Sequence, residues 1–260
     1  MRVPGARYVR KLVAGLMRAR RKAPTGDPTA FRNGFFSQYP RFSETSTVAA
    51  NIARLNFRYE HVIAQNRHLL EGRRVLDIAS HDGRFSFAAL KGAGAKHVVG
   101  LEARGSLVKH SRETLAHYGM ADSAFRFIEG DVFETIRQIE PGSIDTVLVL
   151  GFLYHTARQY ELASAISRIG ATAVIIDSNV IANEPRPIIQ LKWEGTGSDA
   201  QIWDAERKEV LSSKPSASAI QMFFEEFGYK MKHLPVKVKL PPAATEYRTK
   251  ARVTLTGTRD

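Results

Sequence analysis

Residues 75–87 read V-L-D-I-A-S-H-D-G-R-F-S-F, and this stretch decides the fold of the chain. An apolar run ends at Asp77, a tight turn of small and polar residues follows, and a second apolar segment starts after Gly83. About twenty residues further along the chain, another apolar run ends at Glu102. This spacing is typical of a β-turn-α-β unit in which the acid after the second strand binds a ribose.

The turn distinguishes between two kinds of nucleoside cofactor. A dinucleotide needs a glycine-rich turn and a helix N-terminus that faces the pyrophosphate, but only Gly83 is a glycine here. Asp77 and Asp82 also place negative charge where a pyrophosphate would lie. A cofactor with a sulfonium, an ammonium and no phosphate fits that charge, so we expect S-adenosylmethionine. The alternative is an ordinary strand-turn-helix without a ligand.

The rest of the chain alternates strands and helices, with five β-α repeats followed by a helix and two strands. This order predicts an α/β fold with a Rossmann-like, seven-stranded sheet, mostly parallel with an antiparallel closing strand. We expect three parts: a basic tail and linker (1–28), an N-terminal helical region whose aromatic residues pack on the core or form a lid (29–71), and the main domain (72–260). The expected strands are 74–78, 97–101, 125–129, 145–150, 173–177, 229–237 and 252–257.

Ligands of such sheets bind at the carboxyl ends of the parallel strands. Asp77, Glu102, Asp131 and Gly151 fall at the ends of four expected strands. Each of them alone could cap a turn, but together they predict a nucleoside-binding site at one edge of the sheet.

With these residues in place, residues 72–260 resemble the class I S-adenosylmethionine-dependent methyltransferases. The resemblance implies that Glu102 holds both ribose hydroxyls and that Asp131 meets the adenine amino group. The turn departs from the acid-x-Gly-x-Gly-x-Gly pattern of that family, because Ala79 and His81 stand at the first two glycine positions. We expect Ala79 to be tolerated with a negative φ. The resemblance assigns these residues to the cofactor: Asp77, Ala79, Ser80, His81, Gly83, Phe85, Glu102, Ala103, Asp131, Val132, Leu150 and Gly151.

The segment Gly151-Phe152-Leu153-Tyr154-His155 gives a narrower resemblance. A G-x-L-Y-H segment after the fourth strand is similar to the branch that contains the wobble-uridine carboxymethyltransferases of tRNA and several sugar O-methyltransferases. In that fold the segment faces the transferred methyl group. An alcohol is a poor nucleophile until its proton is withdrawn, and an imidazole with a pKa near about 6.5 can accept it. We expect His155 to be this base or a structural hydrogen-bonding group, and Tyr154 to shape the acceptor site or to pack.

A magnesium ion is the alternative means of acidifying a hydroxyl, as some sugar O-methyltransferases use. Asp177, at the end of the fifth strand, and Glu194, in the insert that follows it, offer the carboxylates that this hard ion prefers. Nothing in their spacing defines a metal site. Asp177 is thus a candidate for the catalytic group as well as for the metal.

Composition limits the remaining possibilities. The 260 residues contain no cysteine, which excludes disulfides, thiolate metal sites and a cysteine nucleophile and agrees with a cytoplasmic protein. No apolar run of about 18 residues is present to span a membrane. Of the net charge of +12, eight charges lie before Asp27. Apolar residues recur at helical spacing within that tail, so it fits an anionic membrane surface, a nucleic-acid backbone or a solvated helix.

Three classes of function follow from these observations. The first is a methyltransferase for a hydroxyl of a small molecule, sugar or glycan, and the second is a tRNA-modifying enzyme. The nearly neutral remainder of the chain disfavours the second class, because a tRNA site usually needs a broad basic face. The third is a cofactor-binding module without catalysis. A homodimer is an expected assembly of the chain.

Overall fold

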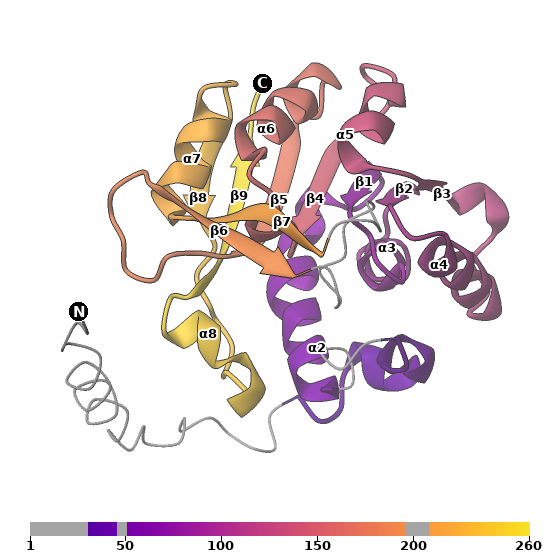
Figure 1. Cartoon of the computed structure of the whole chain (residues 1–260). Helices are drawn as coiled ribbons and strands as arrows, with labels where there is room; N and C mark the ends of the chain where they lie inside the picture. Colours follow the sequence, from indigo (N-terminus) through magenta and orange to yellow (C-terminus); the bar gives the residue numbers. More distant parts are fainter. Residues whose placement is uncertain (1–30, 46–50, 196–207) are drawn as a thin grey trace, which may run out of the picture.

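The computed structural model describes residues 31–45, 51–195 and 208–260, so the expected tail and linker lie outside the described residues. At its centre is a seven-stranded sheet with the order β3-β2-β1-β4-β5-β9-β8 (Figure 1). Strands β1 to β5 are parallel, and β9 runs antiparallel to both of its neighbours. The predicted architecture is therefore confirmed. The strands are β1 (Arg74–Ile78), β2 (His97–Glu102), β3 (Phe125–Glu129), β4 (Thr146–Leu150), β5 (Ala173–Asn179), β8 (Lys230–His233) and β9 (Arg252–Thr258).

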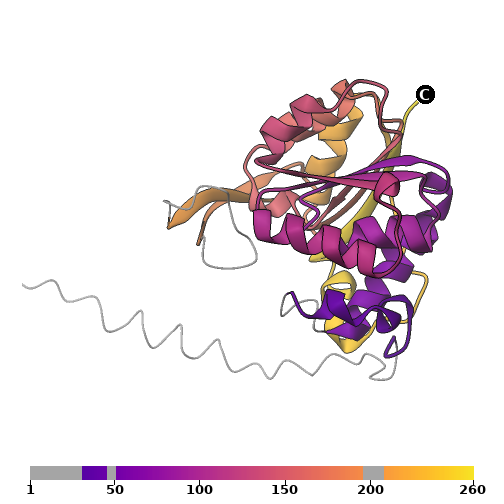
Figure 2. The ribbon, with the colours of Figure 1, turned by 90° about the vertical axis from the view of Figure 1, so that its right-hand side faces the viewer.

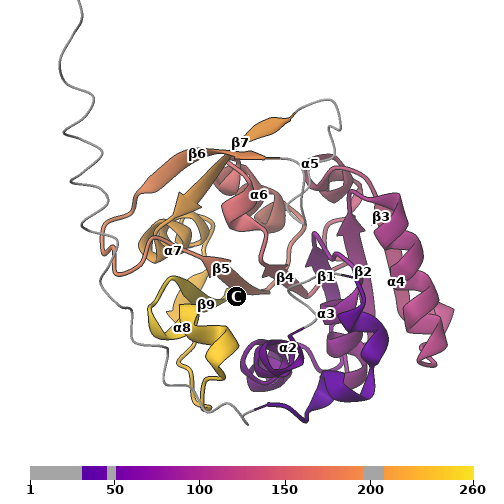
Figure 3. The ribbon, with the colours of Figure 1, turned by 60° about the horizontal axis from the view of Figure 1, so that its bottom comes forward.

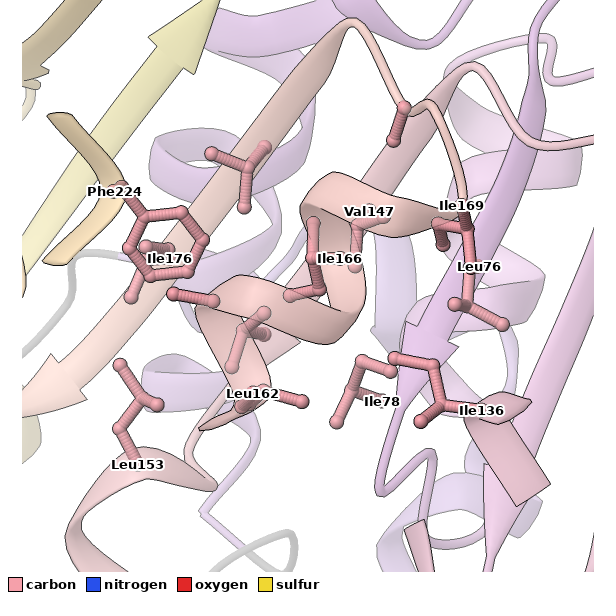
Figure 4. Close-up of a cluster of buried hydrophobic side chains, with 14 of the residues drawn as sticks. Leu76, Ile78, Ile136, Val147, Leu153, Leu162, Ile166, Ile169, Ile176 and Phe224 are labelled. Atoms are coloured by element: carbon pink, nitrogen blue, oxygen red, sulfur yellow. The ribbon is translucent and has the colours of Figure 1, made fainter. Parts of the chain in front are cut away.

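Helices cover both faces of the sheet, and the strand residues alternate between the two cores (Figures 2 and 3). Leu76 and Val147 pack under α5, α6 and α7 (Figure 4), whereas Val75 and Leu148 pack under α2, α3 and α4. None of the helices in the described ranges is long and apolar enough to cross a bilayer. The helices are α2 (Ile52–Arg58), α3 (Arg84–Phe87), α4 (Gly105–His117), α5 (Val132–Thr135), α6 (Gln159–Arg168), α7 (Ala217–Glu225) and α8 (Thr245–Arg248).

The aromatic residues before α2 pack on the domain. Phe36 and Phe42 are fully buried, and the Tyr39 ring lies 4.7 Å from that of Phe87 on α3. Asn51 caps α2, which continues as a π-helical turn and then a 3₁₀ helix up to Leu69. In the described residues this region is thus part of the core of the domain, as the packing interpretation expects.

A β-hairpin follows β5, where the sequence pattern predicts no secondary structure. Strands β6 (Ile189–Gly195) and β7 (Glu209–Pro215) pair in an antiparallel two-stranded sheet that projects from the body (Figure 2). The residues of β6 alternate between apolar and polar, and this pattern is the signal that could have predicted that strand. Ser213 anchors the hairpin, because its hydroxyl donates to the Thr156 carbonyl at 2.8 Å and accepts from the Gln159 amide at 2.8 Å.

One buried carboxylate joins the sheet to the segments around it. Asp177, at the end of β5, has no exposed surface, and its Oδ1 accepts from Arg58 Nη2 at 2.8 Å and from Arg252 Nε at 2.7 Å. Its Oδ2 accepts from the hydroxyls of Tyr247 at 2.7 Å and Thr254 at 2.9 Å. These donors come from α2, α8 and β9, so one side chain fixes three distant segments against β5. Although burial alone would raise it, Arg252 and Arg58 hold the pKa of Asp177 well below its usual range.

Replacing Asp177 with Asn should lower the free energy of unfolding by about 3–5 kcal/mol, because two buried guanidinium groups would lose their counter-charge. Urea denaturation at pH 7 measures this change. Glu184→Gln is the matched control, since Glu184 pairs with the exposed Arg186 and its loss should change stability little. Equal stability of the two variants would show that Asp177 does not hold these segments together.

Candidate active site

The parallel register brings the expected site residues to one edge of the sheet. Ile78 is level with Leu101 of β2 and Val149 of β4, so the turn after β1 lies between the ends of these strands. Leu150 is level with Asp177, and the Gly151 N–H donates to the Asp177 carbonyl at 2.8 Å. The carboxyl ends of β1, β2, β4 and β5 therefore form one continuous edge.

The turn after β1 has the backbone of a glycine-rich loop without most of the glycines. Ala79, His81 and Gly83 have φ values of +52°, +54° and +74°. The expectation of a negative φ at Ala79 is therefore wrong. Left-handed geometry costs a non-glycine residue roughly 1–2 kcal/mol, and the surroundings must hold it. The Ser80 N–H donates to the Leu101 carbonyl at 2.8 Å, and this bond ties the turn to β2.

Glu102 is the second support of this turn. It is 4% exposed, and its Oε2 accepts from the His81 N–H at 2.9 Å. Its Oε1 accepts from the backbone N–H and the Nε of Arg104, at 3.1 and 3.0 Å. A carboxylate offers about four acceptor positions, and three of them are filled. A ligand that needs both oxygens would thus displace the Arg104 side chain.

The charges in the turn differ from the sequence-based expectation. Asp82 is buried against Arg84, whose Nε lies 2.6 Å from its Oδ1. Although burial alone would raise the pKa of Asp82, this guanidinium holds it well below its usual range. Asp77 accepts from the Ser86 hydroxyl at 2.7 Å, and burial raises its pKa to about 7. The Asp82 charge is therefore neutralised internally and that of Asp77 is partial, so the charge argument against a pyrophosphate is weaker than the sequence suggests.

The other predicted cofactor residues have three kinds of place in the structure: one caps a helix, two lie in the hydrophobic cores, and two lie at the ends of strands. Asp131 caps α5, because its Oδ1 accepts from the Phe133 N–H at 2.8 Å. Val132 and Phe85 are 5% and 6% exposed and belong to the two cores. Ala103 is partly exposed directly after β2. Leu150, at the end of β4, packs partly buried on the core under α2, α3 and α4.

His155 and Glu194 form a pair that the sequence does not indicate. The Nδ1 atom of His155, on the 3₁₀ turn Leu153–His155, lies 3.1 Å from both carboxylate oxygens of Glu194 on β6. Nδ1 beside a carboxylate carries the proton, which leaves the lone pair of Nε2 free to accept another. Burial lowers the pKa of His155, and Glu194 partly opposes this, so the neutral form predominates at pH 7. The Tyr154 ring lies against the His155 ring, with the ring centroids 4.1 Å apart and the planes tilted by 48°.

The surroundings of Asp177 do not fit a magnesium ion. Both of its oxygens accept from cationic or hydroxyl donors, and those positions are not open to a cation. In residues 31–45, 51–195 and 208–260, no group of three or more His, Asp or Glu side chains could hold a metal. The interpretation of Asp177 as a metal ligand or catalytic group is therefore wrong, and Glu194 is the partner of His155 instead.

Comparisons with known proteins bear on the fold and the family of this chain. Residues 75–172 match the family model described as a methyltransferase domain. The N-terminal domain of EvdMO1, solved with S-adenosylhomocysteine (SAH) bound, shares the fold with a TM-score of 0.57 and 14% identity, over 78% of this chain and 81% of that one. The chain thus contains a segment that matches a methyltransferase domain, and it shares the fold of a domain that binds S-adenosylhomocysteine.

Two further comparisons show how much of this chain and of the matched protein is covered. The protein arginine N-methyltransferase 8-B of Danio rerio is 31% identical over 104 residues, which is 40% of this chain and 24% of the relative. This chain thus matches only about a quarter of that protein. A Haloferax volcanii structure with the Trm112 methyltransferase activator shares the fold, with a TM-score of 0.55 and 17% identity over 88% of this chain and 97% of that one.

The raised pKa of Asp77 predicts that this residue destabilises the folded domain above neutral pH. In the unfolded chain its pKa is near about 3.9, so the folded state binds the proton more tightly and stability falls as the pH rises from about 4 to about 7. Asp77→Asn keeps the acceptor for Ser86 and should stabilise the ligand-free protein at pH 8 by up to about 4 kcal/mol, with little effect at pH 4. Denaturation at the two pH values measures this, and an equal gain at both would contradict it.

Proposed function

We propose that the chain is an S-adenosylmethionine-dependent O-methyltransferase that acts on a hydroxyl of a small molecule, sugar or glycan. The observation that supports this proposal most strongly is the His155–Glu194 pair at the end of β4. It lies on the same sheet edge as the turn and the carboxylate that suit the cofactor. A base is needed there only if the acceptor must lose a proton, and hydroxyls are such acceptors.

The residues at the ends of β1 and β2 fit the cofactor. The strained turn from Ala79 to Gly83 brings the backbone close to any ligand at this edge, as the positive φ values allow. Glu102 offers its fourth acceptor position to a ribose hydroxyl, and offers a second when the Arg104 side chain turns away. When bound, the cofactor supplies a methyl group on a sulfonium, which leaves the protein to orient the acceptor and to move its proton.

His155 then performs the proton transfer. Its Nε2 would accept the proton of the acceptor hydroxyl, whose oxygen would take the methyl group that the bound cofactor supplies. The resulting imidazolium is stabilised by the Glu194 carboxylate at Nδ1. Tyr154 borders the same space and shapes the acceptor site.

A sugar is the favoured acceptor class, with tRNA as the second candidate. The EvdMO1 domain was also solved in the presence of SAH and D-fucose. The eight basic charges of the tail favour nucleic acid instead. Titration with bulk tRNA at several salt concentrations separates the two, because phosphate contacts give a steep salt dependence.

A cofactor-binding module without catalysis would bind SAH but transfer no labelled methyl group to any fraction of a cell extract.

The proposal extends to the surroundings of the enzyme. We propose that the protein is cytoplasmic and is a homodimer or a monomer. We also propose that its basic tail binds an anionic membrane surface if it does not bind nucleic acid. Deletion of residues 1–22 would separate this role from catalysis, because the tail precedes the apolar core.

Glu102→Ala should weaken S-adenosylmethionine binding by about 1.5–3 kcal/mol, because charge-assisted hydrogen bonds are lost and the turn loses a support. Calorimetry measures this change. Glu129→Ala is the matched control, since Glu129 is level with Glu102 on the neighbouring strand and is exposed. Wild-type affinity in Glu102→Ala would show that this residue is not part of the site. Tighter binding of NAD than of S-adenosylmethionine would overturn the assignment of the cofactor.

His155→Ala should lower kcat by about 10²–10⁴-fold with nearly constant cofactor affinity. In the wild type, kcat should rise with pH through one ionisation below about 6.5, because burial lowers the pKa of His155 and the neutral form is active. Glu194→Gln should move this ionisation to lower pH, since the Glu194 charge raises that pKa. A methyl-transfer assay with a labelled donor and the acceptor fraction of an extract measures kcat of His155→Ala and the pH profiles of the wild type and Glu194→Gln.

His97→Ala is the control for these variants, because His97 begins β2 at the opposite edge of the sheet. It should retain wild-type kcat. If His155→Ala keeps more than about a third of wild-type turnover, His155 is not the base, since a general base contributes far more than that.

A further inference from the structure

The cluster around Asp177 contains more positive charge than it can neutralise. Arg58 and Arg252 are 8% and 3% exposed, and both donate to the same oxygen of Asp177. Both guanidinium groups stay charged at any physiological pH. Tyr247 and Thr254 donate to the other oxygen as neutral hydroxyls, so they add donors and no negative charge. One buried positive charge is therefore left over, which is costly unless an anion completes the cluster.

The hydrogen bonds of Arg58 point to the same deficit. Its Nη2 reaches Asp177, but its Nε is buried and has no hydrogen-bond partner among the described residues. A buried donor without an acceptor costs about 1–3 kcal/mol. Arg252 uses its Nη1 on the side chain of Asn179 at 3.2 Å and its Nε and Nη2 on Asp177. The cluster is thus short of acceptor atoms as well as of negative charge.

The space over Gly151 gives this cluster an opening toward the acceptor site. Gly151 has a φ of +94°, and a Cβ there would have two atoms of the described residues within 4 Å besides its chain neighbours. These atoms are Arg252 Nη2 at 3.5 Å and the Tyr154 hydroxyl at 3.6 Å. Among the described residues, a guanidinium and a hydroxyl therefore border the space over Gly151. The Tyr154 ring also contacts the His155 ring.

We propose that Arg58, Arg252 and Tyr154 form a binding site for a carboxylate group of the methyl acceptor. The inference rests on the proposed function and specifies its substrate class as an acidic molecule, such as an acidic sugar. One unneutralised charge matches a monoanion, and the planar fork of a guanidinium matches a carboxylate. A carboxylate held here would place the rest of the acceptor beside His155.

The methionine part of the cofactor also has a carboxylate, and the same chemistry would suit it. The place of the opening, between the ends of β4 and β5 and next to Tyr154 and His155, assigns the site to the acceptor. The turn after β1 and Glu102, which suit the cofactor, lie at the ends of β1 and β2. The experiment below separates the two sources.

The test is calorimetric titration of D-glucuronate into the full chain saturated with SAH, with D-glucose as the neutral probe. D-glucuronate should bind at least tenfold more tightly than D-glucose. Arg58→Gln and Tyr154→Phe should each reduce this preference at least threefold. Tyr154→Phe keeps the ring and does not touch Asp177, so it tests the site even if Arg58→Gln impairs folding. Arg54→Gln is the control and should keep the full preference, because Arg54 lies on the same helix and pairs with Glu246 instead.

Each alternative result has one meaning. Equal binding of the two probes, or a preference that survives in Tyr154→Phe and Arg58→Gln, overturns the carboxylate site. If D-glucuronate binds only the free protein and SAH displaces it, the carboxylate belongs to the cofactor and the acceptor assignment is wrong. If SAH itself does not bind, the proposed function fails first and the acceptor site falls with it, so the two failures are distinguishable.

Discussion

The buried Asp177 carboxylate is the interaction on which the geometry of this edge of the sheet depends. It accepts hydrogen bonds from residues 119, 75 and 70 positions away in the chain, on α2, β9 and α8. Its backbone carbonyl also accepts from Gly151, which fixes the start of the loop that contains Tyr154 and His155. Because each of these groups is buried, loss of the carboxylate would leave charges without partners and not merely remove one contact. The proposed acceptor site is thus built around a structural ion cluster.

The proposed cofactor side and the proposed acceptor side of the site differ in how they are built. On the side of β1 and β2, the backbone has strained left-handed geometry at Ala79 and His81. The Glu102 carboxylate stabilises this geometry by accepting a hydrogen bond from the His81 N–H. Such strain persists only where the surroundings impose it, and it is common where a backbone must approach a ligand closely. On the side of β4 and β5, side chains define the site. There the hairpin β6–β7 brings Glu194 to His155.

The sequence predicts the sheet and the acidic residues at its carboxyl edge well, because both follow from local patterns. Apolar strands that are buried on both faces and end in an acid are visible in a short window, as 75–77 and 98–102 show. The partners of Asp177 and Glu194 could not be predicted, since they come from pairings over 39 to 119 residues that no local pattern encodes. The magnesium interpretation is wrong for this reason: an acid at a strand end is visible in the sequence, but the arginines that neutralise it are not. The left-handed φ of Ala79 likewise comes from the bonds of the turn to β2 and not from the preference of alanine.

The central claim is that one edge of the sheet holds the methyl donor between Glu102 and His155. A crystal structure of the full chain with SAH tests it most directly. We expect the ribose hydroxyls within hydrogen-bonding distance of Glu102, the Arg104 side chain turned away from Oε1, and the sulfur facing the space bordered by Tyr154 and His155. SAH bound elsewhere, or bound at this edge with its sulfur directed away from His155, would contradict the account.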